Sequence, residues 1–291
     1  MEFNTKEVRD LAWVIQSPEL SFFEGYKYSI NTDNRALNYL EKLDADPSEL
    51  LDYLELNKES KRLGKYFELL LNYHFLNDIG ICEVKKGIQI QYNKRTLGEL
   101  DFLIKPKGYA DWIHLEVAVK FYLAFVKNGT THFIGPNSKD TFRRKKKKLI
   151  NRQIDLSNSE ESMQQLGDVS IGKRAVIMKG YVFVNRFLPE QLDLTEINEY
   201  CLKGWWCNLD DFINNTESNQ MYSVLNKLDW LSGFIGSENS IYSFENLVDL
   251  VKQRILELPL MLAVVEEKSP SLYVEISRGV LVNLDWPNVE L

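Results

Sequence analysis

Two acidic residues stand inside stretches of the sequence that are otherwise rich in large apolar residues. Asp101 lies within Leu100–Ile104, and Glu116 lies within His114–Phe121. Burying a lone carboxylate costs several kcal/mol, so buried acids are paired, protonated or bound to a metal ion. The two residues therefore point to a charged site, and its chemistry depends on how the acids are neutralised.

Both stretches are predicted to be β-strands, at residues 97–104 and 114–123, joined by a loop that contains proline and glycine. Side chains of a strand alternate between its two faces, which places Glu116 and Lys120 on the same face of the second strand. If the two strands pair as a hairpin, Asp101 joins Glu116 on one face, within reach of one ion.

These residue types suit a divalent cation. Lys120 neutralises only one of the two acids, and Mg²⁺ or Mn²⁺ bound by Asp101 and Glu116 would balance the remaining charge. Mg²⁺ prefers carboxylate, water and phosphate oxygens, and it acts as a Lewis acid on a phosphoryl oxygen and on bound water. Lys120 would orient that water or steady the developing charge. The alternative is an ion pair between Glu116 and Lys120 on a half-exposed strand, with Asp101 at the strand edge.

The element before these strands is predicted to be an amphipathic helix at residues 59–77. Its apolar residues recur every three or four positions, and Glu68 lies at the border of that stripe. A strand at residues 83–92, in which Gly87 is expected to mark a bulge, follows this helix. The helix thus brings a third acid towards the two strands.

The charge of the chain is unevenly distributed. The 291 residues have a net charge of −7, but residues 138–152 alone carry +7, so the remainder sums to −14. Such a cluster can bind an anion such as the nucleic-acid backbone, and the alternative is a solvated helix face. A helix capped by Asn137 or Ser138 and reaching about Ile154 is predicted to carry it. The expected nucleic-acid-binding residues are Lys139, Arg143, Arg144, Lys145, Lys146, Lys147, Lys148 and Arg152.

The predicted order of elements over the middle of the chain is helix, three strands, helix and strand, the last strand being at residues 175–184. This order indicates an α/β fold. We expect an N-terminal helical region at 1–57, a core at 58–185 and a C-terminal α+β region at 186–291. Elements expected in the last region are a strand with Trp205-Trp206, a helix at about 244–256, and strands near 261–265, 272–276 and 280–284.

Several blocks of the sequence resemble a bacterial family known as domain of unknown function DUF1853. The blocks are Thr96–Leu103, His114–Phe121 and Phe133–Asn137, with Lys179–Phe183 and Gly204–Trp206 as further matches. The order of elements and acids also resembles the PD-(D/E)XK nuclease superfamily. This resemblance implies a restriction-endonuclease-like core and a Mg²⁺-dependent nuclease that hydrolyses phosphodiester bonds in DNA.

The resemblance also implies roles for individual residues. Asp101 and Glu116 take the metal-ligand positions, and Glu68 takes that of the helix acid. Lys120 takes the position of the catalytic lysine with a departure, because the superfamily pattern places a lysine where this chain has Ala118. Gln153, on the inward side of the basic helix, resembles a glutamine that RecB-like nucleases place beside the metal; the alternative is a polar residue at the border of the helix.

Other features narrow the class of protein. The longest apolar run, Leu258–Val265, is too short to cross a bilayer, and the three cysteines are widely spaced, which favours a reduced, cytoplasmic protein. Two other functions stay open. One is a nucleic-acid-binding protein of the same fold without catalysis. The other is a protein-interaction module, in which Trp205 and Trp206 would form a docking surface.

Overall fold

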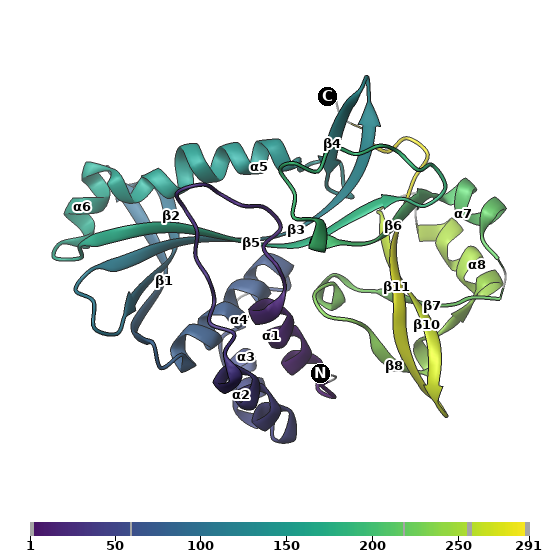
Figure 1. Cartoon of the computed structure of the whole chain (residues 1–291), viewed down its shortest axis with the longest axis horizontal. Coiled ribbons are helices and arrows are strands. Elements are labelled where there is room, and N and C mark those ends of the chain that lie inside the picture. Colours follow the sequence, from purple (N-terminus) through teal and green to yellow (C-terminus); the bar gives the residue numbers. More distant parts are fainter. Residues whose placement is uncertain (1–2, 59, 218, 255–257, 289–291) are drawn as a thin grey trace. The chain divides into compact units, whose positions relative to one another are not determined.

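The computed structural model describes residues 3–58, 60–217, 219–254 and 258–288 (Figure 1). Contacts divide the chain into two compact units. The first unit comprises residues 1–119 and 144–179, and the second comprises residues 120–143 and 180–291. These two units differ from the three regions expected from the sequence, because residues 144–179 belong to the same unit as residues 1–119.

The first unit opens with four helices, of which α4 is the one that supports the site. They are α1 (Lys6–Gln16), α2 (Asn34–Ala45), α3 (Ser48–Leu56) and α4 (Leu63–Asn77). The apolar stripe predicted for α4 is buried, with Phe67 and Leu70 inaccessible to solvent. Phe75 of this helix packs edge-on against Phe102, which lies on the second strand, with ring centroids 5.5 Å apart. The hydrophobic stripe therefore fixes α4 against the strand that carries Asp101.

The strands of the first unit form an antiparallel meander. They are β1 (Ile81–Tyr92), β2 (Arg95–Pro106) and β3 (Trp112–Lys127), and the order of neighbouring strands continues from β3 to β5 (Ile171–Asn185). Asn93 and Lys94 both have positive φ, as expected for a tight hairpin turn between β1 and β2. The bulge predicted at Gly87 is wrong. The register of β1 and β2 shifts near Ile81 and Ile90 instead, although Gly87 does adopt a φ of 65°.

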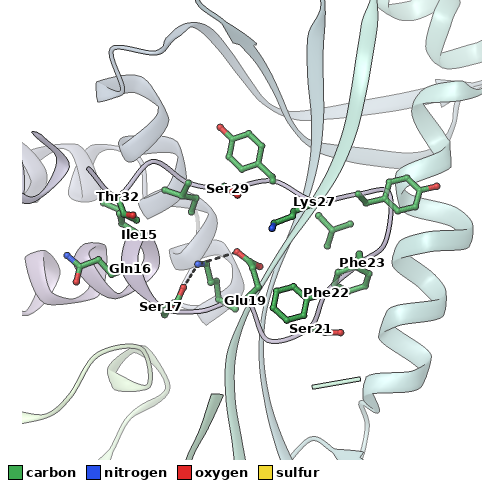
Figure 2. Close-up of a pocket in the computed structure, with 15 residues that line it drawn as sticks. Ile15, Gln16, Ser17, Glu19, Ser21, Phe22, Phe23, Lys27, Ser29 and Thr32 are labelled. Atoms are coloured by element: carbon green, nitrogen blue, oxygen red, sulfur yellow. Dashed lines mark hydrogen bonds and ion pairs between the residues drawn. The ribbon is translucent and has the colours of Figure 1, made fainter. Parts of the chain in front are cut away.

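The segment between α1 and α2 lies along β5, as Figure 2 shows. The backbone N–H of Leu20 donates to the carbonyl of Met178, and that of Val176 donates to the carbonyl of Tyr26. The buried Lys179 ammonium lies 3.2 Å from a Glu19 carboxylate oxygen and donates to the carbonyl of Ser17. These bonds satisfy the Lys179 ammonium and backbone groups beside the pocket that this segment lines, whereas the buried Ser17 hydroxyl has no hydrogen-bond partner among the described residues.

The basic segment is a helix with a change of pitch. It runs as α5 (Phe142–Lys148), a π-helical turn (Leu149–Gln153), a 3₁₀ turn (Ile154–Asn158) and α6 (Glu160–Leu166). The predicted start near Asn137 or Ser138 is wrong, because residues 135–141 form a loop. In this loop the N–H of Ser138 donates to the carbonyl of Gly135, and Ser138 has a φ of 59°.

The second unit continues β3 and β5 into further strands, parallel and antiparallel, so the fold is α/β with mixed strand directions. Neighbouring strands run in the order β5-β6-β11-β10-β7-β9, with β4 paired to β3 and β8 paired to β11. The elements are β4 (Thr130–Ile134), β6 (Leu202–Asn208), α7 (Leu209–Asn215), β7 (Met221–Leu225), β8 (Ile235–Ser237), β9 (Tyr242–Ser243), α8 (Phe244–Arg254), β10 (Leu260–Ser269) and β11 (Leu272–Val282), with 3₁₀ turns at Glu199–Cys201, Lys227–Asp229 and Glu238–Ser240.

The tryptophan pair belongs to the core of this unit. Trp205 and Trp206 are less than 10% exposed; Trp205 stacks on Phe212, and the indole N–H of Trp206 donates to the carbonyl of Ala124 at 2.9 Å. The pair does not form a surface, so the docking surface expected from these two residues is wrong. In the part of the chain that the structure describes, no helix is both long enough and apolar enough to span a membrane.

Candidate active site

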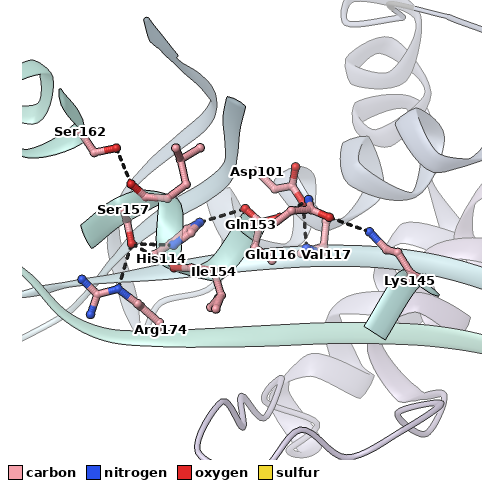
Figure 3. Close-up of polar contacts among 11 residues, drawn as sticks. Asp101, His114, Glu116, Val117, Lys145, Gln153, Ile154, Ser157, Ser162 and Arg174 are labelled. Atoms are coloured by element: carbon pink, nitrogen blue, oxygen red, sulfur yellow. Dashed lines mark hydrogen bonds and ion pairs between the residues drawn. The ribbon is translucent and has the colours of Figure 1, made fainter. Parts of the chain in front are cut away.

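Asp101 and Glu116 lie opposite each other where the β2–β3 ladder opens. The ladder pairs Ile104 with Ile113 and Phe102 with Leu115, and the next two positions in this register are Asp101 and Glu116. At this point a side chain links the two strands: the Asp101 carboxylate accepts the N–H of Val117 at 2.9 Å (Figure 3). The predicted hairpin thus brings both acids to one place.

Glu116 is fully buried and is held at both carboxylate oxygens. The Gln153 amide donates to Oε2 at 2.5 Å, and Nε2 of His114 lies 3.0 Å from Oε1. Gln153 comes from the π-helical turn, and Figure 3 shows it beside Glu116. The structure therefore brings Gln153, as expected from the sequence, to the acid beside which it was predicted to lie.

Behind Glu116, a chain of hydrogen bonds reaches β5. Nδ1 of His114 is 2.9 Å from the Ser157 hydroxyl, and Nε of Arg174 donates to the same hydroxyl at 2.9 Å. Burial lowers the pKa of His114 to about 4, so the ring is neutral near pH 7. The neutral ring contacts Glu116 through Nε2 and Ser157 through Nδ1, and one of these two nitrogens carries the ring hydrogen. This chain fixes the orientation of the glutamate.

Asp101 and Glu116 both hold their protons more tightly than free carboxyl groups do. Burial raises the pKa of Asp101, and the nearby charge of Glu116 raises it further. Burial also raises the pKa of Glu116, against the favourable charge of Lys145. The result is a pair of acids that releases its last proton with difficulty and gains from a bound cation.

Glu68 lies on α4, and the charge of Asp101 acts on its carboxyl group. Its carboxylate accepts from the Lys65 ammonium at 2.7 Å, and Lys65 lies 3.4 Å from Glu99 as well. Burial raises the pKa of Glu68, and the charge of Asp101 adds to that effect. Glu68 therefore interacts electrostatically with Asp101, and the Lys65 ammonium is its ion-pair partner.

Lys120 belongs to the second unit, and its ammonium forms an ion pair with Asp140 at 2.6 Å. In the first unit the cation that acts on the two acids is Lys145, which also donates to Oε1 of Gln153 at 3.1 Å. Sequence reasoning assigned Lys145 only to nucleic-acid binding. It missed the inward role because the spacing of lysines in a run of four does not tell which one faces the strands.

The other cations of the basic segment are distributed over several settings. Arg144, Lys147, Lys148 and Arg152 line one surface hollow together with Asn151. Lys146 is half-buried, and Lys139 and Arg143 belong to the second unit. Four of the expected anion-binding residues therefore form one exposed group on the helix.

His114, Ser157 and Arg174 are the further residues of the site that sequence reasoning did not assign. His114 shares the strand face of Glu116, two positions away, which was a usable signal. Ser157 and Arg174 carry no such signal, because their meeting depends on the 3₁₀ turn and on β5.

The carboxylates at this site determine which divalent cation the site suits. Among the described residues no group of three or more histidine, cysteine, aspartate or glutamate side chains is placed to hold a metal ion. Asp101 and Glu116 supply two carboxylates, and Mg²⁺ characteristically binds one or two carboxylates and completes its shell with water and phosphate oxygens. The pair fits Mg²⁺ or Mn²⁺ on this basis and does not fit a site built from protein ligands alone.

Comparison with known proteins gives a family and no closer relative. No curated protein matches the chain, and no solved structure matches it. A family model described as a domain of unknown function (DUF1853) matches residues 9–282, which is nearly the whole chain. The chain belongs to the DUF1853 family.

Proposed function

We propose that the protein is a Mg²⁺-dependent nuclease of the PD-(D/E)XK superfamily that hydrolyses phosphodiester bonds in DNA. The observation that carries the proposal is the convergence of Asp101 and Glu116 at the open end of the β2–β3 ladder, with the Gln153 amide on Glu116. Two acids in contact with each other must retain a proton or bind a cation, and the neighbouring helix presents cations that suit a phosphate backbone.

Asp101 and Glu116 would hold the cation, with Glu68 bordering them. When bound, Mg²⁺ or Mn²⁺ supplies Lewis-acid chemistry to a phosphoryl oxygen and to water. The chain's own residues set the geometry. Val117 fixes the Asp101 carboxylate, while His114 and Gln153 fix both oxygens of Glu116. Ligands held in this way by surrounding hydrogen bonds lose little freedom when the site is filled.

Lys120 is proposed to stabilise the charge that develops on the phosphoryl group, as the superfamily pattern implies. This role requires its ammonium to leave Asp140, with which it forms an ion pair. Breaking this ion pair has an energetic cost, which binding of the substrate would have to offset. The proposed catalytic set is therefore Lys120 together with Glu68, Asp101, Glu116 and Gln153.

The exposed cations of the basic segment are proposed to bind the DNA backbone. Arg144, Lys147, Lys148 and Arg152 share one hollow, and side chains of this kind contact phosphates without reading the base sequence. All three cysteines are free thiols, in keeping with action in the reducing bacterial cytoplasm.

A second candidate function is nucleic-acid binding without catalysis. The ion pair between Lys120 and Asp140 favours it, since a lysine that stays paired cannot serve the reaction. DNA binding with a steep dependence on salt would be common to both functions, whereas strand cleavage belongs only to the first.

The test is cleavage of supercoiled, linear and single-stranded DNA by the full chain. The nuclease proposal predicts scission that requires Mg²⁺ or Mn²⁺, stops with chelator, and falls by about 10³-fold or more in Asp101→Asn, as expected when a metal ligand is removed. Glu83→Gln, a change at an exposed acid of β1, is the matched control. DNA binding without scission in both metals would favour the second candidate.

A further inference from the structure

Lys145 differs from the other cations of its segment. It is half-buried, and it donates to Oε1 of Gln153 at 3.1 Å, whereas Lys147 and Lys148 are exposed. The two partners are eight positions apart in the sequence. Figure 3 shows the Lys145 side chain reaching from α5 towards the amide on Glu116.

The π-helical turn makes this contact possible. On a regular α-helix a residue eight positions further along is rotated by about 80°, because each residue adds about 100°. The turn Leu149–Gln153 is wider than an α-helical turn, so each of its residues adds less rotation. Gln153 therefore returns to the face of Lys145, and the long side chains span the rise between them.

Lys145 also decides which way the Gln153 amide points. A glutamine amide has one oxygen that accepts and one nitrogen that donates. With the oxygen on the Lys145 ammonium, the nitrogen faces Glu116 and donates at 2.5 Å. A flipped amide would place its oxygen against the carboxylate and its N–H groups against the ammonium, two repulsive contacts. The lysine thus selects the orientation that holds Glu116.

Its charge has a second effect at the same place. The positive charge of Lys145 acts favourably on Asp101 and on Glu116, while the ammonium of Lys120 is engaged by Asp140. Within the first unit, the lysine whose charge acts on Asp101 and Glu116 is therefore Lys145 of α5.

We propose that Lys145 is a positioning residue of the nuclease site: it orients the Gln153 amide on Glu116 and places a fixed positive charge beside both acids. The proposal rests on the nuclease function proposed above. Lys145 acts through Gln153 and is therefore distinct from the exposed cations that are proposed to bind the DNA backbone.

Steady-state kinetics of DNA cleavage test the proposal. Lys145→Ala is expected to lower kcat by about 10- to 100-fold with little change in KM, as loss of a residue behind a metal ligand typically does. Lys145→Arg keeps a donor and a charge and should restore most of kcat. Lys147→Ala should raise KM and spare kcat, and Lys173→Ala, at an exposed lysine of β5, should alter neither.

A double-mutant cycle separates an effect through Gln153 from a general loss of charge. Because Lys145 acts through the amide, Lys145→Ala should lower kcat much less in the Gln153→Ala background than in wild type, leaving only the effect of its charge. Multiplying effects would overturn the proposal, as would a Lys145→Ala variant that resembles Lys147→Ala.

The same cycle measured by urea unfolding of the metal-free protein needs no catalysis. A coupling between Lys145 and Gln153 that is absent between Lys147 and Gln153 is expected. If wild type cleaves no DNA but this coupling is present, the nuclease function fails while the contact stands. If wild type cleaves DNA and the coupling is zero, the inference about Lys145 fails alone.

Discussion

Glu116 is a fully buried acid whose two oxygens are each contacted by a neutral polar group, the His114 ring and the Gln153 amide. Neutral polar groups orient a carboxylate without cancelling its charge. Asp101 is half-buried opposite Glu116, and its carboxylate accepts a backbone N–H. At the scale of single residues, the site thus holds two acids together at a cost to the stability of the metal-free protein.

This cost predicts that removing one of the two acids stabilises the metal-free protein. In the presence of chelator at pH 8, Asp101→Asn should raise the free energy of unfolding by roughly 2 kcal/mol, because it removes one of two repelling charges while its side-chain oxygen still accepts the Val117 N–H. Urea unfolding measures the change. Glu83→Gln, at an exposed acid that pairs with Lys105, serves as control. A destabilised Asp101→Asn protein would contradict the view that the two acids repel.

Much of this site was accessible from residue patterns, and the limits are instructive. Alternation along two strands placed Asp101 and Glu116 on one face, helical periodicity placed Glu68 at the border of the preceding helix, and the resemblance to RecB-like nucleases pointed to Gln153. Lys145 could not be singled out, because its role depends on a π-helical turn that no proline or glycine announces. The Ser157–Arg174 contact links two elements seventeen residues apart and has no periodic signature.

At the scale of elements, α4 supports β2 with its buried face, and this face also contains a titratable residue. His74 is 8% exposed and lies 4.0 Å from the Asp78 carboxylate, and its Nε2 has no hydrogen-bond partner among the described residues. Burial lowers the pKa of His74 to about 4. Helix α4 therefore contains a group that must stay neutral for the helix to remain packed.

The sign of the resulting pH dependence follows from the two pKa values. In the unfolded chain a histidine binds its proton near pH 6.5, whereas folded His74 does so only near pH 4. Its contribution to stability is therefore complete above about pH 6.5 and is lost as the pH falls towards 4. Compared with wild type, His74→Phe should gain up to about 3 kcal/mol between pH 7.5 and pH 4, measured by urea unfolding. A difference independent of pH would show that His74 titrates as in the unfolded chain.

Other elements show why the sequence predicted the fold only in part. The hairpin that adds β4 turns at Asn128-Gly129, both with positive φ, and this dipeptide is a recognised turn signal that the prediction did not use. Helix α2 begins at a capping aspartate, Asp33, which accepts two backbone N–H groups. The predicted start of the basic helix failed for a different reason, since the loop 135–141 is held by bonds that a capping signal does not reveal.

At the scale of the whole molecule, charge is the property that bears on function. A protein of net charge −7 is repelled by DNA at long range, yet residues 138–152 carry +7. The units found in the structure could not be read from the sequence, because strands β3 and β5 each run from one unit into the other. Local composition along the chain does not mark such boundaries.

The cationic group predicts a salt dependence. Replacing Arg144, Lys147, Lys148 and Arg152 by glutamine should weaken DNA binding and reduce the slope of log K against log salt by about 0.9 for each phosphate that the variant no longer neutralises. Fluorescence anisotropy at several salt concentrations measures the slope. Glutamine at four exposed lysines elsewhere, Lys107, Lys127, Lys173 and Lys227, makes the same change in net charge. Equal slopes in the two variants would reduce the group to a solvated helix face.

The central claim is that Asp101 and Glu116 together hold one divalent cation, and crystals soaked in Mn²⁺ test it most directly. The account predicts one anomalous difference peak between the two carboxylates, with an oxygen of each at about 2.1 Å and water completing the shell. The peak should vanish in Asp101→Asn crystals grown and soaked in the same way. Full-occupancy Mn²⁺ elsewhere, with the Asp101 and Glu116 carboxylates still sharing no ion, would contradict the account.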